Sequence, residues 1–118
     1  MPWNYSQSTG SLTRDGHFVA AGYSGAGTGR NNPTLEAVPN VGPIPRGLYR
    51  IGPRFDAVKQ GPCVMRLTPL GHDALGRDGF LIHGDNLTHD ASTGCVILPH
   101  QTREAIAASP DRDLVVAA

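Results

Sequence analysis

The 118-residue chain contains 15 glycines and 10 prolines, and its ten basic side chains balance ten acidic ones at pH 7. Leu, Ile, Val and Phe number 26, about 22%, just above the roughly 20% that a folded core requires. We therefore expect one small domain spanning residues 1–118. A neutral chain attracts neither phosphate backbones nor anionic lipid, and its longest apolar run, 114–118, is far too short for a spanning helix. We expect no nucleic-acid or membrane partner.

The first 23 residues favour strands separated by a tight turn. Trp3 and Tyr5 alternate with polar neighbours, which is typical of a half-buried strand. The dipeptide Asp15-Gly16 precedes the run 17–23 and is a strong hairpin signal. The sequence therefore predicts a β-hairpin at the start of the domain.

Residues 24–41 are rich in Gly, Asn and Pro and have neither helical nor strand periodicity. A loop this long is often functional, since long structureless loops are uncommon in small domains. The same residues are also ordinary turn formers, so a loose surface excursion is equally consistent with the pattern.

Short strands and one helix account for the rest of the chain. Strand patterns occur at 46–51, 63–67, 78–83, 94–98 and 113–117. In the first of these, Leu48 and Arg50 are expected on the face opposite Tyr49 and Ile51. Good helix formers follow Pro99 over 101–109. We predict a mainly β fold, a small β-sandwich or β-roll with one short helix near the C-terminus.

The reactive residues flank a polar loop. His83 closes one predicted strand and Cys95 opens the next, so neighbouring strands would bring thiol and imidazole together. An imidazole that accepts the thiol proton is expected to lower the pKa of the cysteine from about 8.5 by several units. The alternative is that Cys95, next to Val96 and Ile97, is a small buried hydrophobic residue.

The residue before the cysteine also suits acyl-transfer chemistry. Gly94 lacks a Cβ, so backbone N–H groups at Gly94 and Cys95 could approach and stabilise an oxyanion. We expect the Cys95 N–H to be the main donor.

These motifs occur in the order typical of a known family. His83-Gly84 and Ser92-Thr93-Gly94-Cys95 resemble the signature of L,D-transpeptidase catalytic domains, which have the YkuD-like fold. Pro45–Ile51 resembles that family's Pro-x-Gly-x-aromatic-x-Ile strand. Further segments are similar to the L,D-transpeptidase-related antibacterial effectors of type VI secretion systems, namely 3–10, 22–25, 31–33, 42–45 and 79–85.

The resemblance implies a cofactor-free cysteine enzyme of peptidoglycan. Cys95 would attack the amide between meso-diaminopimelate and the terminal D-Ala of a stem tetrapeptide, with His83 as its base. Water as the acceptor would give L,D-carboxypeptidase activity, and a D-amino acid would give exchange of the terminal residue. The sequence leaves both outcomes open.

The resemblance also implies a delivery route and partners. Residues 1–10 lack the basic and apolar regions of a Sec signal, which suits injection by a type VI apparatus into the periplasm of target bacteria. A cognate periplasmic immunity protein is then expected. The alternative is a catalytically silent cell-wall-binding or phage-structural module with the same fold.

The sequence departs from the family pattern around the cysteine. Thr93 stands where many members have histidine, and Val96 follows Cys95 where many have an arginine that binds the substrate carboxylate. Arg77, which is nearest the motif, could substitute, and Arg30 and Arg46 are further candidates. For all three, a surface charge is the more frequent explanation.

Three more residues are candidates for substrate binding, each with a structural alternative. Tyr23 could offer its phenol or be an interior aromatic residue. Ser92 could bind substrate or form hydrogen bonds within the turn, and Asp85 could orient an imidazole or end the strand. Cys63 is most simply a core residue.

A metal site is the least favoured interpretation. His83, Asp85, His89, Asp90, Cys95 and His100 lie within eighteen positions. Their spacing matches no common zinc motif, and a zinc ion would sequester the thiolate. We therefore expect no metal, and a metallohydrolase remains only a third alternative.

Overall fold

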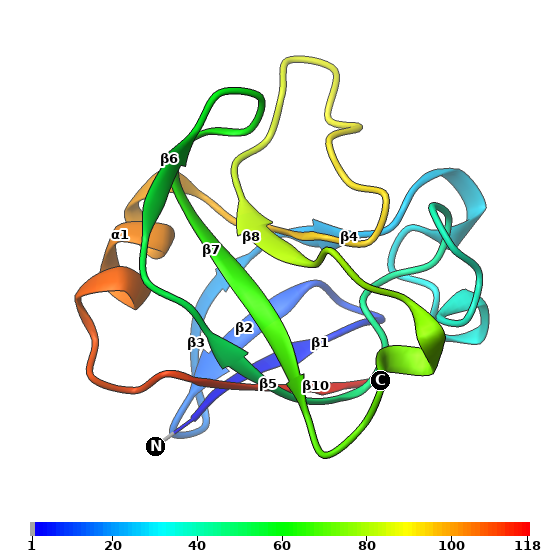
Figure 1. The fold of residues 1–118 in the computed structure, drawn as a ribbon, viewed down its shortest axis with the longest axis horizontal. Coiled ribbons are helices and arrows are strands. Elements are labelled where there is room, and N and C mark those ends of the chain that lie inside the picture. The colour runs from blue at the N-terminus through cyan, green and yellow to red at the C-terminus, as the bar shows by residue number, and fades with distance from the viewer. Residues whose placement is uncertain (1) are drawn as a thin grey trace.

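Ten strands form one hydrogen-bonded sheet in the computed structural model, which describes residues 2–118 (Figure 1). The order is β3-β2-β1-β10-β5-β7-β8-β9-β4, with β6 paired to β7. The strands are β1 (Trp3–Ser6), β2 (Ser11–Arg14), β3 (His17–Ala21), β4 (Tyr23–Ser24), β5 (Gly47–Ile51), β6 (Phe55–Ala57), β7 (Gly61–Leu70), β8 (Leu81–His83), β9 (Val96–Ile97) and β10 (Asp113–Ala117). The helices are α1 (His100–Ala108) and the 3-10 turns η1 (Gly27–Gly29), η2 (Pro33–Leu35) and η3 (Ala74–Gly76). The predicted mainly β fold with one C-terminal helix is confirmed.

The predicted hairpin connects β2 and β3. Asp15 and Gly16 have φ angles of 53° and 76°, the left-handed conformation that a two-residue hairpin turn requires at both positions. The strands pair antiparallel, with a register shift after Leu12. Local turn chemistry was therefore sufficient to locate this element.

The two ends of the chain pair with each other. β1 runs parallel to β10, with Trp3 opposite Leu114 and Tyr5 opposite Val116. On its other side, β10 pairs antiparallel with β5. These four side chains are buried, so the alternation in each strand supplies one wall of the core.

Strand β7 joins the two halves of the sheet. Its C-terminal part pairs with β5 and its middle part, at Met65 and Arg66, pairs with β8. Figure 1 shows β7 running diagonally between β8 and the strands β5 and β10. It has ten residues, longer than the predicted 63–67, because Gly61 pairs with β6 and residues 68–70 pair with β5. The sequence pattern did not reveal β6.

The core lies between these two halves and beneath α1. Its members come from both halves of the sheet and include Tyr5, Leu12, Tyr49, Ile82 and Val96. Helix α1 packs on β7 and contributes Ile106, which is fully buried. None of the helices in residues 2–118 is long and apolar enough to cross a membrane.

Candidate active site

The parallel pair of β8 and β9 brings the two reactive residues together. Ile82 lies opposite Val96, and His83 lies opposite Ile97. Ile82 and Val96 are fully buried in the core, so His83, one position further, faces the other side of the sheet. His83 and Cys95 line a common cavity of about 280 Å³, here called the His83 cleft. Its other residues include Lys59, Gln60, Asp85, Asn86 and Thr93.

The hydrogen bond of His83 defines its tautomer. Nδ1 lies 2.8 Å from the carbonyl oxygen of Gly84, and because a carbonyl only accepts, the proton is on Nδ1 and Nε2 keeps its lone pair. Burial lowers the pKa of His83 below its ordinary 6.5, and the positive charge of Arg103 acts in the same direction. At neutral pH the imidazole is therefore an uncharged base.

The thiol of Cys95 is also uncharged. Burial raises its pKa above the ordinary 9.0, although the Leu81 N–H and the charge of Arg77 act in the opposite direction. Its Sγ lies 3.8 Å from the carbonyl oxygen of Gly79. The expected lowering of this pKa by several units is wrong, because desolvation outweighs the groups that favour the thiolate. The site holds a neutral thiol and a neutral imidazole rather than a preformed ion pair.

Gly94 gives the turn before Cys95 its shape. Its φ is +143°, and a Cβ there would lie 2.6 Å from Nη2 of Arg77, so a side chain does not fit. The Gly94 N–H donates to Oγ of Ser92 at 3.1 Å and is not available to an oxyanion. Among residues 2–118 the Cys95 N–H has no hydrogen-bond partner, so it remains the candidate donor.

Ser92 belongs to this turn. Its hydroxyl accepts from the N–H groups of Gly25 at 2.9 Å and Gly94, and donates to the Cys95 carbonyl at 2.6 Å. The side chain is only 1% exposed. These bonds use the hydroxyl fully, so its contacts match the structural alternative rather than substrate binding.

The glycine-rich loop supports the same turn. Ser24 Oγ donates to the Gly94 carbonyl at 3.0 Å and accepts from the Ile44 N–H at 2.8 Å. Ser24, at the start of the loop, thus joins Ile44, just beyond its end, to the turn before Cys95. These bonds fit a functional loop, which supports the turn before Cys95, better than a loose surface excursion. No sequence motif had indicated the role of Ser24.

Arg77 is buried, which contradicts the expectation of a surface charge. It is 8% exposed and donates to four backbone carbonyls, those of Glu36 (2.6 Å), Pro43 (2.8 Å), Gly42 (3.1 Å) and Thr93 (3.3 Å). Burial lowers the pKa of Arg77 below the ordinary value of an arginine. Arg77 therefore fastens the long loop to the turn before Cys95 and leaves a positive charge beside the thiol.

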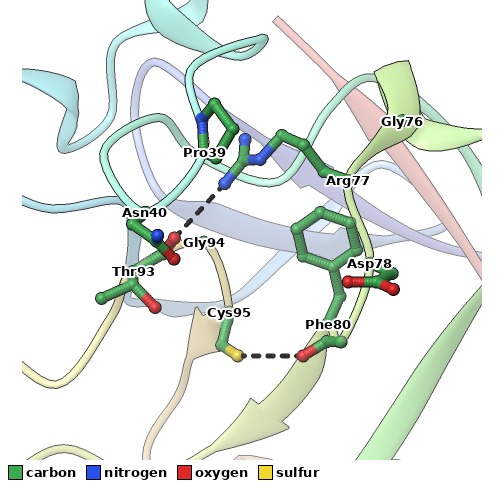
Figure 2. A pocket seen from close by; sticks show the side chains of 10 residues that line it. Pro39, Asn40, Gly76, Arg77, Asp78, Phe80, Thr93, Gly94 and Cys95 are labelled. Atoms are coloured by element: carbon green, nitrogen blue, oxygen red, sulfur yellow. Dashed lines mark hydrogen bonds between the residues drawn. The ribbon is translucent and has the colours of Figure 1, made fainter.

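A second cavity lies beside Arg77 (Figure 2). This Arg77 cleft also measures about 280 Å³ and includes Asn40, Asp78 and Phe80. Cys95 and Thr93 line both clefts. The thiol therefore stands where two small cavities adjoin.

Tyr23 and Asp85 bind each other. The phenol donates to Asp85 at 2.5 Å and accepts from the Ala91 N–H at 2.9 Å. The other carboxylate oxygen of Asp85 accepts from His89 at 2.8 Å, so Asp85 orients His89 and not His83. Tyr23 lines neither cleft beside Cys95 but a separate cavity with His100.

The other two candidate arginines also have partners. Arg30 donates to the His89 carbonyl at 2.7 Å and stacks 3.6 Å from the ring centre of Tyr23. Arg46 pairs with Glu36 at 2.5 Å. Neither lines the clefts beside Cys95.

Arg103, which no sequence motif indicated, is buried against Gly84, the neighbour of His83. It is 6% exposed and donates to the carbonyls of Leu98 (3.0 Å) and Pro62 (2.7 Å). A Cβ on Gly84 would lie 2.7 Å from its Nη2. The available signal was helical spacing, since Arg103 and the buried Ile106 are three positions apart and share a face of α1.

Both cysteines are free, with Cys63 buried as expected of a core residue. Within residues 2–118 no group of three or more His, Cys, Asp or Glu side chains is arranged to hold a metal ion.

The fold and the site together define a small β-rich domain that presents a thiol and an uncharged imidazole at adjoining clefts. Residues 19–114 match the family model of the Tlde1 domain. The chain belongs to this family, whose domains are L,D-transpeptidase-like effector domains of type VI secretion. No curated protein matches the chain. The predicted relationship is thereby confirmed at the level of the family.

Proposed function

We propose that this domain is a cysteine acyltransferase that removes or exchanges the terminal D-Ala of peptidoglycan stem tetrapeptides. The observation that carries the proposal is the shared cleft of Cys95 and His83, in which Nδ1 of the imidazole is held by Gly84 and Nε2 is free to accept a proton. A thiol and an uncharged base at one cleft are the two groups from which covalent catalysis by a cysteine is built.

The first half-reaction forms a thioester. Sγ of Cys95 attacks the carbonyl carbon of the amide between meso-diaminopimelate and D-Ala while Nε2 of His83 takes the thiol proton. The Cys95 N–H donates to the oxyanion. The C–N bond then breaks, His83 gives its proton to the leaving nitrogen, and D-Ala departs as an amine.

The second half-reaction releases the acyl group. Water that gives a proton to His83 hydrolyses the thioester and yields the tripeptide. A D-amino acid that attacks by the same route restores a tetrapeptide with a new terminal residue. In both cases the sulfur recovers its proton from His83.

The biological role follows from the family. Type VI effector domains act on target cells. The proposed substrate, the stem tetrapeptide of peptidoglycan, is located in the periplasm. We place the activity there and propose a cognate immunity protein in the periplasm of the producing cell. Expression with an added Sec leader should slow growth of a Gram-negative host, expression without it should not, and Cys95→Ala should abolish the effect.

Incubation of the full chain with disaccharide tetrapeptide, followed by mass spectrometry, tests the chemistry. We expect loss of D-Ala and, with an added D-amino acid, a product carrying that residue. Cys95→Ala should abolish both reactions, and Cys63→Ala, the matched change of the other cysteine, should retain them.

The alternatives give different results in the same assay. Binding of the tetrapeptide without turnover by the wild-type chain would favour a silent wall-binding module. Activity that a chelator abolishes and zinc restores would favour a metallohydrolase. Turnover that survives Cys95→Ala would refute the thioester mechanism.

A further inference from the structure

Each of the two clefts at Cys95 is lined by one basic and one acidic side chain. Lys59, in the turn between β6 and β7, lines the His83 cleft, and Asp78 lines the Arg77 cleft. Figure 2 shows Asp78 and Cys95 around the latter. The His83 cleft also contains Asp85, whose carboxylate is bonded to Tyr23 and His89. The Arg77 cleft also contains the guanidinium of Arg77, which is bonded to four backbone carbonyls.

Lys59 has no partner among the residues that the structure describes. Among residues 2–118, every arginine makes a hydrogen bond, an ion pair or a ring contact, and Lys59 makes none of these. It is also the only lysine of the chain. An exposed ammonium at the edge of a small cavity is available to an anionic ligand group, because no carboxylate of residues 2–118 is paired with it.

The position of the base fixes which part of the substrate enters this cleft. His83 must deliver a proton to the leaving nitrogen, so that nitrogen lies on the imidazole side of Cys95, in the His83 cleft. The carboxylate of an amino-acid leaving group is only two bonds from this nitrogen. It must therefore enter the same cleft as Lys59, while the acyl group extends toward Asp78 and Arg77.

We propose that Lys59 binds the α-carboxylate of the leaving amino acid and of the amino acid that replaces it, making the His83 cleft an amino-acid subsite. This inference rests on the proposed function. It adds a residue that makes the enzyme specific for substrates with a free carboxyl terminus. The cleft volume of about 280 Å³ lies at the lower end of ligand cavities, which suits a group the size of one amino acid.

Two substrates test the contact between Lys59 and the terminal carboxylate. Disaccharide tetrapeptide ending in D-Ala and the same compound ending in D-alaninamide differ only in the terminal charge. We expect the wild-type chain to prefer the carboxylate by about fivefold in kcat/KM, as for a partly exposed ion pair. Lys59→Ala should remove the preference by slowing the carboxylate substrate alone, and Lys59→Arg should restore it.

The control is Val58→Ala, a change at the fully exposed neighbour in the same turn, which should keep the preference. An equal preference in wild type and Lys59→Ala, or an equal loss on both substrates, would overturn the role of Lys59 and leave the proposed function intact. No turnover of either substrate by the wild-type chain would refute the proposed function and this inference with it.

Discussion

At the scale of single residues, the protonation states of Cys95 and His83 distinguish two mechanisms. A preformed thiolate–imidazolium pair loses activity when the imidazolium deprotonates. Here burial lowers the pKa of His83 and raises that of Cys95, so the resting pair is neutral and the proton moves during attack.

The pH profile of kcat/KM reports which pair is present. The base must be uncharged, so activity should fall as pH decreases through the His83 pKa, with the acid limb below 6.5. Activity should then remain level up to about pH 9.0, because the thiol keeps its proton there. A decline between neutral pH and that value would show that the active form needs an imidazolium.

We expect the backbone conformation of Gly94 to be important for activity. In Gly94→Ala the new Cβ meets Arg77 at 2.6 Å and φ is +143°, so we expect a loss of about 1–3 kcal/mol in unfolding free energy. The turn must shift, and kcat should fall by about tenfold or more. Urea denaturation and steady-state kinetics measure the two effects.

Gly52→Ala is the matched control. A Cβ on Gly52 finds its nearest neighbour, Arg66, at 3.5 Å, which is ordinary contact. Stability and kcat should both stay near wild type. Equal effects of the two substitutions would contradict a special conformational role for Gly94.

At the scale of elements, Arg77 connects two loops that have little regular structure of their own. Its four bonds to backbone carbonyls hold the segment 36–43 against Thr93. Lysine cannot reproduce the planar set of donors, and the unpaired carbonyls would remain in a buried setting. We therefore expect the conformations of both the loop 36–43 and the turn before Cys95 to depend on Arg77.

We expect Arg77→Lys to lower the unfolding free energy by about 3 kcal/mol and to expose the loop 24–43 to proteolysis. Arg46→Lys, at a half-exposed ion pair with Glu36, is the control and should cost less than about 1 kcal/mol. Urea denaturation and limited proteolysis with mass spectrometry read out both effects. Similar losses of stability for both substitutions would show that Arg77 does not hold the loop against Thr93.

At the scale of the whole molecule, the first and last strands, β1 and β10, pair with each other. β10 lies between β1 and β5, so the last strand is internal to the sheet and the core needs it. Leu114 is 1% exposed and faces this core, whereas its neighbour Val115 is half-buried on the other face.

Leu114→Ala should therefore destabilise the domain by about 2–5 kcal/mol, the cost of a core cavity, in a single cooperative transition. Val115→Ala should cost less than about 1 kcal/mol. Thermal and urea unfolding, followed by fluorescence of Trp3, measure both. A separate early transition in Leu114→Ala would mean that β10 folds as an independent unit.

Local patterns predicted much of this protein. Alternation located most strands, Asp15-Gly16 located the hairpin, and the residues around His83 and Cys95 indicated the pair that the structure places at one cleft. These features depend on neighbours in the chain, because turn propensity and side-chain alternation are properties of a few consecutive residues.

Only the tertiary structure decided the parallel pairing of β1 with β10, the burial of Arg77, and the division of the groove at Cys95 into two clefts. It also decided that thiol and imidazole rest uncharged. These features depend either on contacts between distant segments or on the removal of water from charged groups. The spacing of residues along the chain encodes neither of these effects.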